Sequence, residues 1–250
     1  MSFSKWHALG NTYLLAERAE LGGALTPERV RETCDERADG VLEVLSVDGD
    51  TAEIAIWNPD GSTAELSGNG TRIAARWLAE RTGATEVRIR VGDREVRARM
   101  LGGANVETSL GVVEVGEIET LDLGSELVEV TPVSVGNPHA VIRREPERGE
   151  LLRIGPLVET HARFPGRTNV QLVRVDGLHD LTVGVWERGA GETSASGTSA
   201  VASAAAAVAN GWSESPITVH MPGGDLRVTL DAENRATLVG PAERRDDRAS

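Results

Sequence analysis

The chain has 250 residues, of which 40% are apolar and 26% are charged, and this composition excludes disordered, collagen-like and coiled-coil chains. No run approaches the roughly 20 consecutive apolar residues of a membrane span, and the first residues lack the apolar core of a secretory signal, so we expect a cytoplasmic protein with no membrane partner. The formal net charge of −13 would repel a phosphate backbone, which argues against nucleic acid as a partner.

The reactive side chains that cofactors and metals need are scarce. Cys34 is the one cysteine, which excludes an internal disulfide framework and a multi-thiolate metal site. Lys5 is the one lysine, and pyridoxal-phosphate enzymes need a lysine for their Schiff base. We therefore expect no cofactor and no metal, and we interpret Cys34 as a buried apolar residue of a helix.

Strands dominate the chain, with few helices between them. Runs rich in Val, Ile, Leu and Thr, separated by glycine-containing turns, predict strands at residues 2–16, 41–47, 51–57, 86–90, 95–100, 107–115, 127–135, 140–143, 170–176, 181–186, 217–221 and 225–230. Helical periodicity and start signals predict helices over residues 26–36, 70–81 and 198–209. The fold class is therefore α/β (α+β).

Two segments half a chain apart repeat the same pattern of strand, polar loop, small-residue turn and helix. The first reads IWNPDGSTAELSGNGTRIAARWLAE and the second VWERGAGETSASGTSAVASAAAAVAN. This internal repeat predicts two pseudo-symmetric halves, each a β-sheet wrapped around one long helix. We place the N-terminal half at residues 1–115 and the C-terminal half at 116–250, allow the last strand to return to the N-terminal half, and interpret the acidic stretch 114–126 as the linker.

The two turns that open these helices are candidate binding sites. Ser67-Gly68-Asn69-Gly70 and Ser196-Gly197-Thr198-Ser199 each precede a helix, where backbone N–H groups and the positive end of the helix dipole suit a carboxylate or phosphate. Either serine alone is more simply an N-cap. Their matching places in the repeat favour a functional role.

Further polar residues lie at predicted strand ends. They are Asn11, Asn58, Asn137, Asn169, Glu187 and Arg188. Taken singly, each asparagine is more simply a turn residue. As a set, the neutral amides, a carboxylate for an ammonium and a guanidinium for a carboxylate predict a site for a zwitterion.

Five motifs carry a family resemblance. FSKWHALGNTY, IWNPDGSTAELSGNGTR, VSVGNPHAVI, RFPGRTNVQLV and VWERGAGETSASGTSA follow one another in the order and spacing of diaminopimelate epimerase, and the chain resembles this family over nearly its whole length. The resemblance implies two pseudo-symmetric domains, each a curled sheet around a central helix. It also implies cofactor-independent epimerisation of LL-diaminopimelate to meso-diaminopimelate in lysine biosynthesis, in which two cysteines at the two helix starts remove and deliver the α-proton from opposite faces.

The resemblance assigns a role to each candidate residue. Ser67 and Ser196 stand at the positions of the two catalytic cysteines. The residues that the resemblance implies in substrate binding are Asn11, Asn58, Gly68, Asn69, Asn137, Asn169, Glu187, Arg188, Gly197 and Thr198.

The two serines are the main departure from the family. A thiol has a pKa near 8.5, and a helix N-terminus lowers it further, whereas a serine hydroxyl is a far weaker acid. Unless a base such as His139 or Glu187 activates the serines, we expect very slow epimerisation or none. A second departure precedes Ala38-Asp39-Gly40, where the family usually has a Gly-Ile-Gly stretch that this sequence lacks.

Three interpretations remain open. The first is a diaminopimelate epimerase whose two cysteines have been replaced. The second is a natural serine-bearing relative that acts as an epimerase or dehydratase on another amino acid. The third is a non-catalytic amino-acid-binding or scaffolding protein. The expected partner is a small-molecule amino-acid substrate, and a homodimer is compatible with the sequence.

Overall fold

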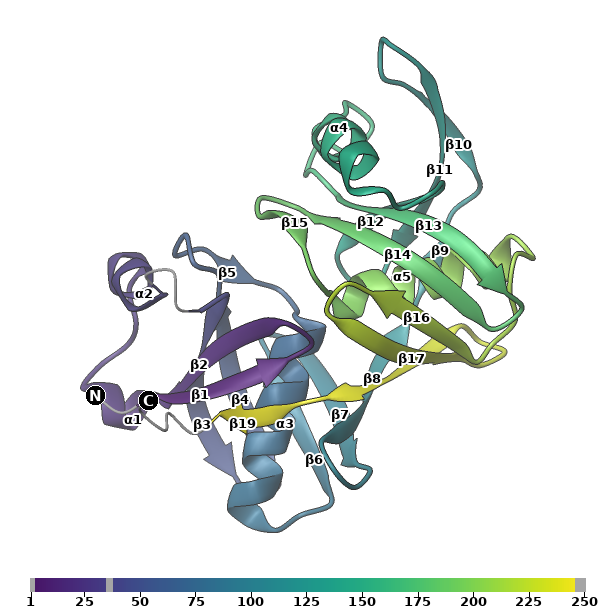
Figure 1. The fold of residues 1–250 in the computed structure, drawn as a ribbon. Helices are drawn as coiled ribbons and strands as arrows, with labels where there is room; N and C mark the ends of the chain where they lie inside the picture. The colour runs from purple at the N-terminus through teal and green to yellow at the C-terminus, as the bar shows by residue number, and fades with distance from the viewer. Residues whose placement is uncertain (1–2, 35–37, 246–250) are drawn as a thin grey trace. The chain divides into compact units, whose positions relative to one another are not determined.

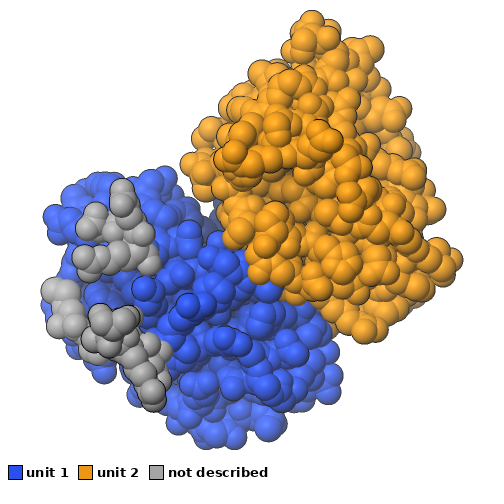
Figure 2. All heavy atoms as spheres, in the orientation of Figure 1, with its two compact units in different colours: residues 1–109, 239–250 blue, residues 110–238 orange. Residues whose placement is uncertain are grey.

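The computed structural model describes residues 3–34 and 38–245 and divides into two compact units (Figure 2). Unit 1 comprises Met1–Ser109 and Val239–Ser250, and unit 2 comprises Leu110–Leu238. The sequence places the boundary six residues later, after residue 115. None of the helices formed by the described residues is long and apolar enough to cross a membrane.

Unit 1 is a mixed sheet with one long central helix (Figure 1). Its strands are β1 (Ser4–Ala8), β2 (Asn11–Glu17), β3 (Gly40–Asp48), β4 (Thr51–Trp57), β5 (Thr63–Ala64), β6 (Glu86–Val91), β7 (Arg94–Met100), β8 (Asn105–Val112) and β19 (Glu243–Arg245), and its helices are α1 (Arg18–Leu21), α2 (Pro27–Cys34) and α3 (Gly68–Thr82). The strand order is β19-β1-β2-β3-β4-β6-β7-β8, with β2–β3 and β4–β6 parallel and the other pairs antiparallel. The short β5 pairs with the end of β4.

Unit 2 repeats this plan. Its strands are β9 (Glu114–Val115), β10 (Glu119–Asp122), β11 (Leu127–Ser134), β12 (Pro138–Arg143), β13 (Asn169–Gly177), β14 (Asp180–Glu187), β15 (Gly191–Thr193), β16 (Ile217–Met221) and β17 (Gly224–Leu230), with β18 (Arg235–Pro241) crossing into unit 1, and its helices are α4 (Arg148–Glu159) and α5 (Gly197–Ala209). The strand order β11-β12-β13-β14-β16-β17 has β12–β13 and β14–β16 parallel. The short β15 pairs with the end of β14, as β5 does with β4.

The central helix of each unit is surrounded by strands. Helix α3 packs against β1, β2, β4, β6 and β7, and α5 packs against β11, β12, β13, β14, β16 and β17. Ile73, Ala74 and Leu78 of α3 are fully buried, and nearly the whole of the alanine-rich α5 is buried, because small side chains let strands approach on several sides. The predicted fold class, two repeated halves with a sheet curled around a helix, is confirmed.

One helix is missing from the sequence prediction. Helix α4 is absent from it, because Gly155 and Pro156 lie inside the helix and are typical helix breakers. Burial of Leu151, Ile154 and Val158 against the sheet stabilises α4 despite them.

The helix predicted over residues 26–36 is observed as α2, and residues 35 and 36 of that prediction lie outside the described part of the chain. Cys34 is buried in an apolar cluster, and burial raises the pKa of its thiol.

One strand prediction and the linker prediction need correction. The described part of the run 2–16 is a hairpin, because Leu9 and Gly10 adopt positive φ angles of 50° and 84° and form a two-residue turn between β1 and β2.

The predicted linker 114–126 contains β9 and β10, which both pair with β11. The interpretation of this stretch as a linker is therefore wrong, because its backbone is part of the sheet of unit 2.

Candidate functional site

Ser67 occupies the N-cap position of α3 with an extended backbone. Its Oγ accepts a hydrogen bond from the backbone N–H of Gly70 at 3.0 Å and lies 3.1 Å from the hydroxyl oxygen of Tyr13 on β2. The first helical backbone bond runs from Thr71 N–H to the Ser67 carbonyl. The N–H groups of Gly68 and Asn69 precede that bond, as expected for a turn that can accept an anion.

A buried arginine supports this turn from inside unit 1. Arg72 is fully buried and donates to the Gly68 carbonyl at 2.9 Å and to Oδ1 of Asn69. Burial lowers the pKa of Arg72 to about 10, and Tyr13 opposes this shift. The Gly68 carbonyl and the side-chain oxygen of Asn69 are therefore directed toward the guanidinium in the protein interior.

The two other predicted residues of unit 1 lie in tight turns. Asn58 follows β4, where its backbone N–H bonds the Ser62 carbonyl at 2.8 Å and its amide nitrogen donates to Ser62 Oγ at 2.9 Å. Asn11 opens β2 directly after the hairpin turn and is partly exposed. The structure thus gives Asn58 a turn-stabilising role in addition to any contact with a ligand.

Ser196 is the N-cap residue of α5, but its side chain makes no cap hydrogen bond. It is 6% exposed, and Gly197, Thr198 and Ser199 after it are buried. The first helical bond runs from Ala200 N–H to the Ser196 carbonyl. Equivalent serines therefore open the two central helices, with their hydroxyl groups in different surroundings.

Asn137 and His139 lie beside the start of α5. The Asn137 amide nitrogen is 3.5 Å from Thr198 Oγ1, and its Oδ1 is 3.0 Å from His139 Nε2. Burial lowers the pKa of His139 to about 3; the Gln171 side chain opposes this shift and the charge of Arg188 adds to it. His139 is therefore a neutral imidazole near neutral pH.

Gln171 joins strand β13 to the first turn of α5. It is fully buried, and its amide nitrogen donates to Ser199 Oγ at 3.0 Å. Ser199 corresponds in the repeat to Gly70, where a Cβ would lie 3.0 Å from Cδ2 of Leu42 and 3.3 Å from Oγ of Ser67. Unit 2 has room for a side chain at this position, and the chain uses it for a buried hydrogen bond.

Asn169 connects the two loops that carry the remaining predicted residues. Its amide nitrogen donates to the Pro138 carbonyl at 2.9 Å, and its Oδ1 accepts the backbone N–H of Arg188 at 2.9 Å. Glu187 ends β14, and the Arg188 side chain donates to the Gly166 carbonyl at 3.4 Å. Asn169 therefore positions the main chain, and within unit 2 it joins the strand that begins at Pro138 to the turn that carries Arg188.

Three residues that shape these turns are missing from the sequence prediction: Tyr13, Arg72 and Gln171. Tyr13 and Gln171 lie inside predicted strands, where alternation indicates which face a side chain takes but not its hydrogen-bond partner. Arg72 is a charged residue among the buried residues of α3. Ser199 belongs to the predicted second turn, and its mismatch with Gly70 in the repeat is the signal for its own role.

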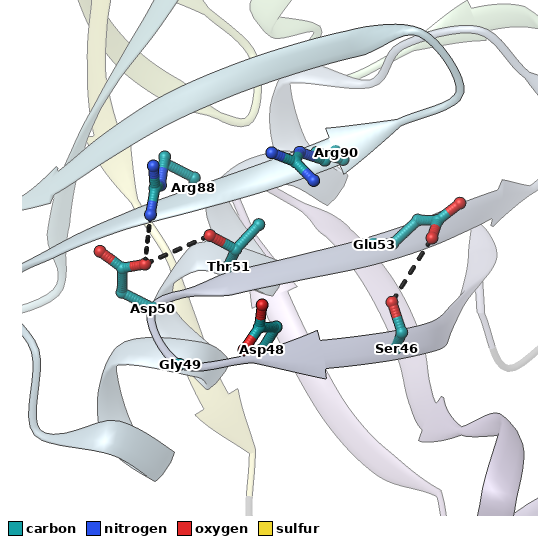
Figure 3. Close-up of a pocket in the computed structure, with 8 residues that line it drawn as sticks. All are labelled: Ser46, Asp48, Gly49, Asp50, Thr51, Glu53, Arg88 and Arg90. Carbon is teal, nitrogen blue, oxygen red and sulfur yellow. Dashed lines mark hydrogen bonds and ion pairs between the residues drawn. The ribbon is translucent and has the colours of Figure 1, made fainter.

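A separate surface hollow of about 350 Å³ lies in unit 1 beside the turn between β3 and β4 (Figure 3). One ion pair and one hydrogen bond join residues that line it: Arg88 bonds Asp50 at 2.6 Å, and Ser46 donates to Glu53 at 3.4 Å. None of the predicted site residues lines it. Across the described ranges, no group of three or more His, Cys, Asp and Glu side chains could hold a metal ion.

Comparisons with known proteins agree with the fold and with the repeat. The family model described as diaminopimelate epimerase matches residues 3–116 and 131–244. The diaminopimelate epimerase of Synechococcus elongatus is 37% identical over 269 residues, which cover 97% of this chain and 95% of that protein. The enzyme of the same name from Magnetococcus marinus is 35% identical over 259 residues, covering 96% and 93%.

Solved structures share the fold at lower sequence identity. A predicted epimerase from Pseudomonas aeruginosa superposes with a TM-score of 0.73 at 18% identity, over 98% of this chain and 96% of the other. A hydroxyproline epimerase from Agrobacterium vitis gives a TM-score of 0.73 at 16% identity, over 98% and 90%. At this identity the likeness concerns the fold alone.

Proposed function

Because the chain belongs to the diaminopimelate epimerase family, we propose that it binds diaminopimelate at the turns that open α3 and α5, with Ser67 and Ser196 in the two acid–base positions. The observation that carries this proposal is that the central helix of each unit begins with an equivalent turn. Each has a serine as N-cap and a glycine as first helical residue. The backbone N–H groups and the dipole at a helix N-terminus suit a carboxylate.

The polar residues around each turn supply the remaining contacts of the proposal. In unit 1, Asn11 and Asn58 offer amide groups, and the turn of Gly68 and Asn69 offers backbone N–H groups at the start of α3. In unit 2, Arg188 offers a guanidinium for a carboxylate and Glu187 a carboxylate for an ammonium, while Asn137 and Thr198 lie at the helix start. The opposite charges of Glu187 and Arg188 match a zwitterion.

Proton transfer is the step that the serines impair. A hydroxyl at a helix start stays protonated near neutral pH, because the dipole effect is far too small to ionise it. Ser67 has Tyr13 and the Gly70 N–H as partners, and neither is a base near neutral pH. His139 directs its Nε2 to Asn137 rather than to Ser196. The chain with serines therefore binds its amino acid and epimerises it very slowly or not at all.

Calorimetry with LL- and meso-diaminopimelate tests the binding proposal, with L-lysine as the matched ligand that lacks the second carboxylate. We expect both isomers to release or absorb heat on binding. The variant Arg188→Gln removes the charged partner of a carboxylate and should weaken binding by about tenfold or more. Absence of binding for both isomers, while another amino acid binds, would assign the site to a different substrate.

The catalytic assignment is tested by restoring thiols. The double variant Ser67→Cys, Ser196→Cys should epimerise diaminopimelate, because a helix N-terminus lowers a thiol pKa into the range of an acid–base catalyst. Each single cysteine variant should remain nearly inactive as an epimerase, since inversion needs a donor on the face opposite the base. Epimerisation and deuterium incorporation are measured in D₂O. A double variant that binds well but stays as inactive as the parent contradicts the assignment.

A further inference from the structure

We propose that Glu159 is a positioning residue of the candidate site, which holds the Glu187-Arg188 dipeptide in place from the end of α4. The inference rests on the proposed function, because it concerns the residues assigned to bind the zwitterion. Glu159 is 3% exposed, and neither the sequence motifs nor the repeat marks it as a site residue.

The carboxylate of Glu159 binds on both sides of the dipeptide. Its Oε2 accepts the indole N–H of Trp186 at 2.7 Å, and its Oε1 accepts the backbone N–H of Gly189 at 2.8 Å. Trp186 precedes Glu187, and Gly189 follows Arg188. Together with the bond from Arg188 N–H to Asn169, these contacts hold the main chain of the turn at two successive residues and the side chain at its entrance.

The chemistry of the partners requires a carboxylate here. The indole N–H and the backbone N–H are donors, and the third partner is the Arg167 guanidinium, whose Nη2 lies 2.8 Å from Oε1. A carboxylate accepts from all three. The glutamine amide of the same size has one oxygen and one NH₂ group, so in either orientation a donor would face a donor. A buried donor left without an acceptor is destabilising.

Close packing supports the same arrangement from α4. A Cβ on Gly155 would lie 2.8 Å from Cγ and 2.9 Å from Cδ2 of Trp186, so the indole rests directly on the helix backbone. Gly155 and Glu159 are four residues apart and share one face of α4. In Figure 1, α4 lies beside β13, β14 and β15, the strands that carry and flank the turn. The glycine admits the indole, and the carboxylate binds its N–H.

Unit 1 contains a chemically matched carboxylate. Glu43 on β3 is fully buried and accepts from the Arg18 guanidinium at 2.8 Å, the backbone N–H of Leu25 at 3.2 Å and the indole of Trp57 at 3.1 Å. Burial alone would raise the pKa of Glu43, but these three hydrogen bonds outweigh it and lower the pKa. Trp57 is the repeat equivalent of Trp186.

The two carboxylates differ in the backbone that they hold. Glu43 binds Leu25, which lies before α2 and outside the residues assigned to the ligand, whereas Glu159 binds Gly189 inside the proposed ligand turn. Both lose the same kind of acceptor in a Glu→Gln exchange. Glu43→Gln is therefore the matched control for amide exchange at Arg188 and Gly189 in Glu159→Gln, because it carries the same chemical defect but has no bond to the turn of Arg188 and Gly189.

The experiment compares Glu159→Gln and Glu43→Gln in the full chain. We expect both to lower the unfolding midpoint. Glu159→Gln should raise the dissociation constant of diaminopimelate by about tenfold or more, and only Glu159→Gln should accelerate amide hydrogen exchange at Arg188 and Gly189. Unchanged binding in Glu159→Gln, or equal exchange at Gly189 in the two variants, would overturn the proposal.

The hydrogen-exchange measurement needs no ligand. It therefore tests the positioning role of Glu159 separately from the proposed binding of diaminopimelate. If the parent chain binds no diaminopimelate, the proposed function fails, and faster exchange at Gly189 in Glu159→Gln still establishes what holds the turn. If Glu159→Gln does not fold, Trp186→Phe keeps an aromatic ring and removes the indole N–H. It should then free one carboxylate oxygen and accelerate amide exchange at Gly189, whereas Trp57→Phe should leave exchange at Gly189 unchanged. Equal exchange at Gly189 in these two tryptophan variants also contradicts the proposal.

Discussion

The hydroxyl oxygen of Tyr13 lies 3.1 Å from Oγ of Ser67, although 54 residues separate them in sequence. The same Oγ accepts the Gly70 N–H at the start of α3. Ser196, at the equivalent position of α5, makes no cap hydrogen bond. One serine of the pair is therefore tied to its helix and to a neighbouring strand, and the other is not tied to its helix.

This difference predicts unequal costs of removing the two hydroxyl groups. Ser67→Ala should lower the free energy of unfolding by about 1 kcal/mol, the usual value of a serine N-cap. Ser196→Ala should cost at most a few tenths of that, because no cap bond is lost. Urea unfolding of both variants measures the two values. A larger loss for Ser196→Ala than for Ser67→Ala would contradict the structure.

Lysine in place of Arg72 should not restore the full stability of the parent protein. Arg72→Met leaves the buried Gly68 carbonyl and Oδ1 of Asn69 without their guanidinium donor, at a cost of about 1–3 kcal/mol per unsatisfied group. Arg72→Lys should recover only part of this, because an ammonium lacks the planar fork that reaches both oxygens. Chemical denaturation compares the three proteins, and full recovery of parental stability by lysine would refute the expectation.

His139 should remain uncharged from pH 5 to pH 8, because burial lowers its pKa to about 3 in the folded chain. In the unfolded chain it protonates below about 6.5. Its neutral burial therefore supports stability above that pH, and this support is lost as the pH falls. Imidazole ¹⁵N shifts assigned to His139 should not titrate between pH 5 and pH 8. As a control, His139→Gln should lose less stability than the parent between pH 7 and pH 5.

His220 should give the folding stability a pH dependence opposite to the one that His139 gives. Its Nδ1 lies 2.8 Å from Oδ1 of Asp225 and its Nε2 lies 3.2 Å from Oδ1 of Asp180. The hydrogen bond to Asp225 raises the pKa of His220, burial opposes the shift, and Asp180 adds to it. The charged imidazole therefore stabilises the fold fully below the unfolded pKa of about 6.5, and this contribution is lost as the pH rises through the higher folded value.

The His220 prediction is checked with His220→Gln. Because the imidazole is partly exposed, the effect is small. The parent should exceed the variant in urea midpoint at pH 5.5 by more than at pH 8.5. A difference between parent and variant that stays constant over this range would show that the two aspartates do not bind the charged form preferentially.

Local patterns in the sequence were sufficient for much of the fold. The repeat around Trp57 and Trp186 predicted two equivalent halves, and the starts of α3 and α5 followed from their caps and glycines. These signals are short-range, because capping and alternation depend on residues a few positions apart. Helix α4 was not predicted because its stability comes from burial against the sheet, whereas Gly155 and Pro156 weaken its local helical pattern.

The fold class, the family and the two turns that carry the candidate site follow from contiguous motifs in the chain. The partners of those motifs depend on packing: Tyr13 lies against Ser67, Arg72 lies in the interior of unit 1, and Glu159 binds Trp186. The physical reason is that a buried donor or acceptor must be satisfied by whichever group packing brings within hydrogen-bond distance. Such a group comes from another strand or helix, which no local pattern specifies.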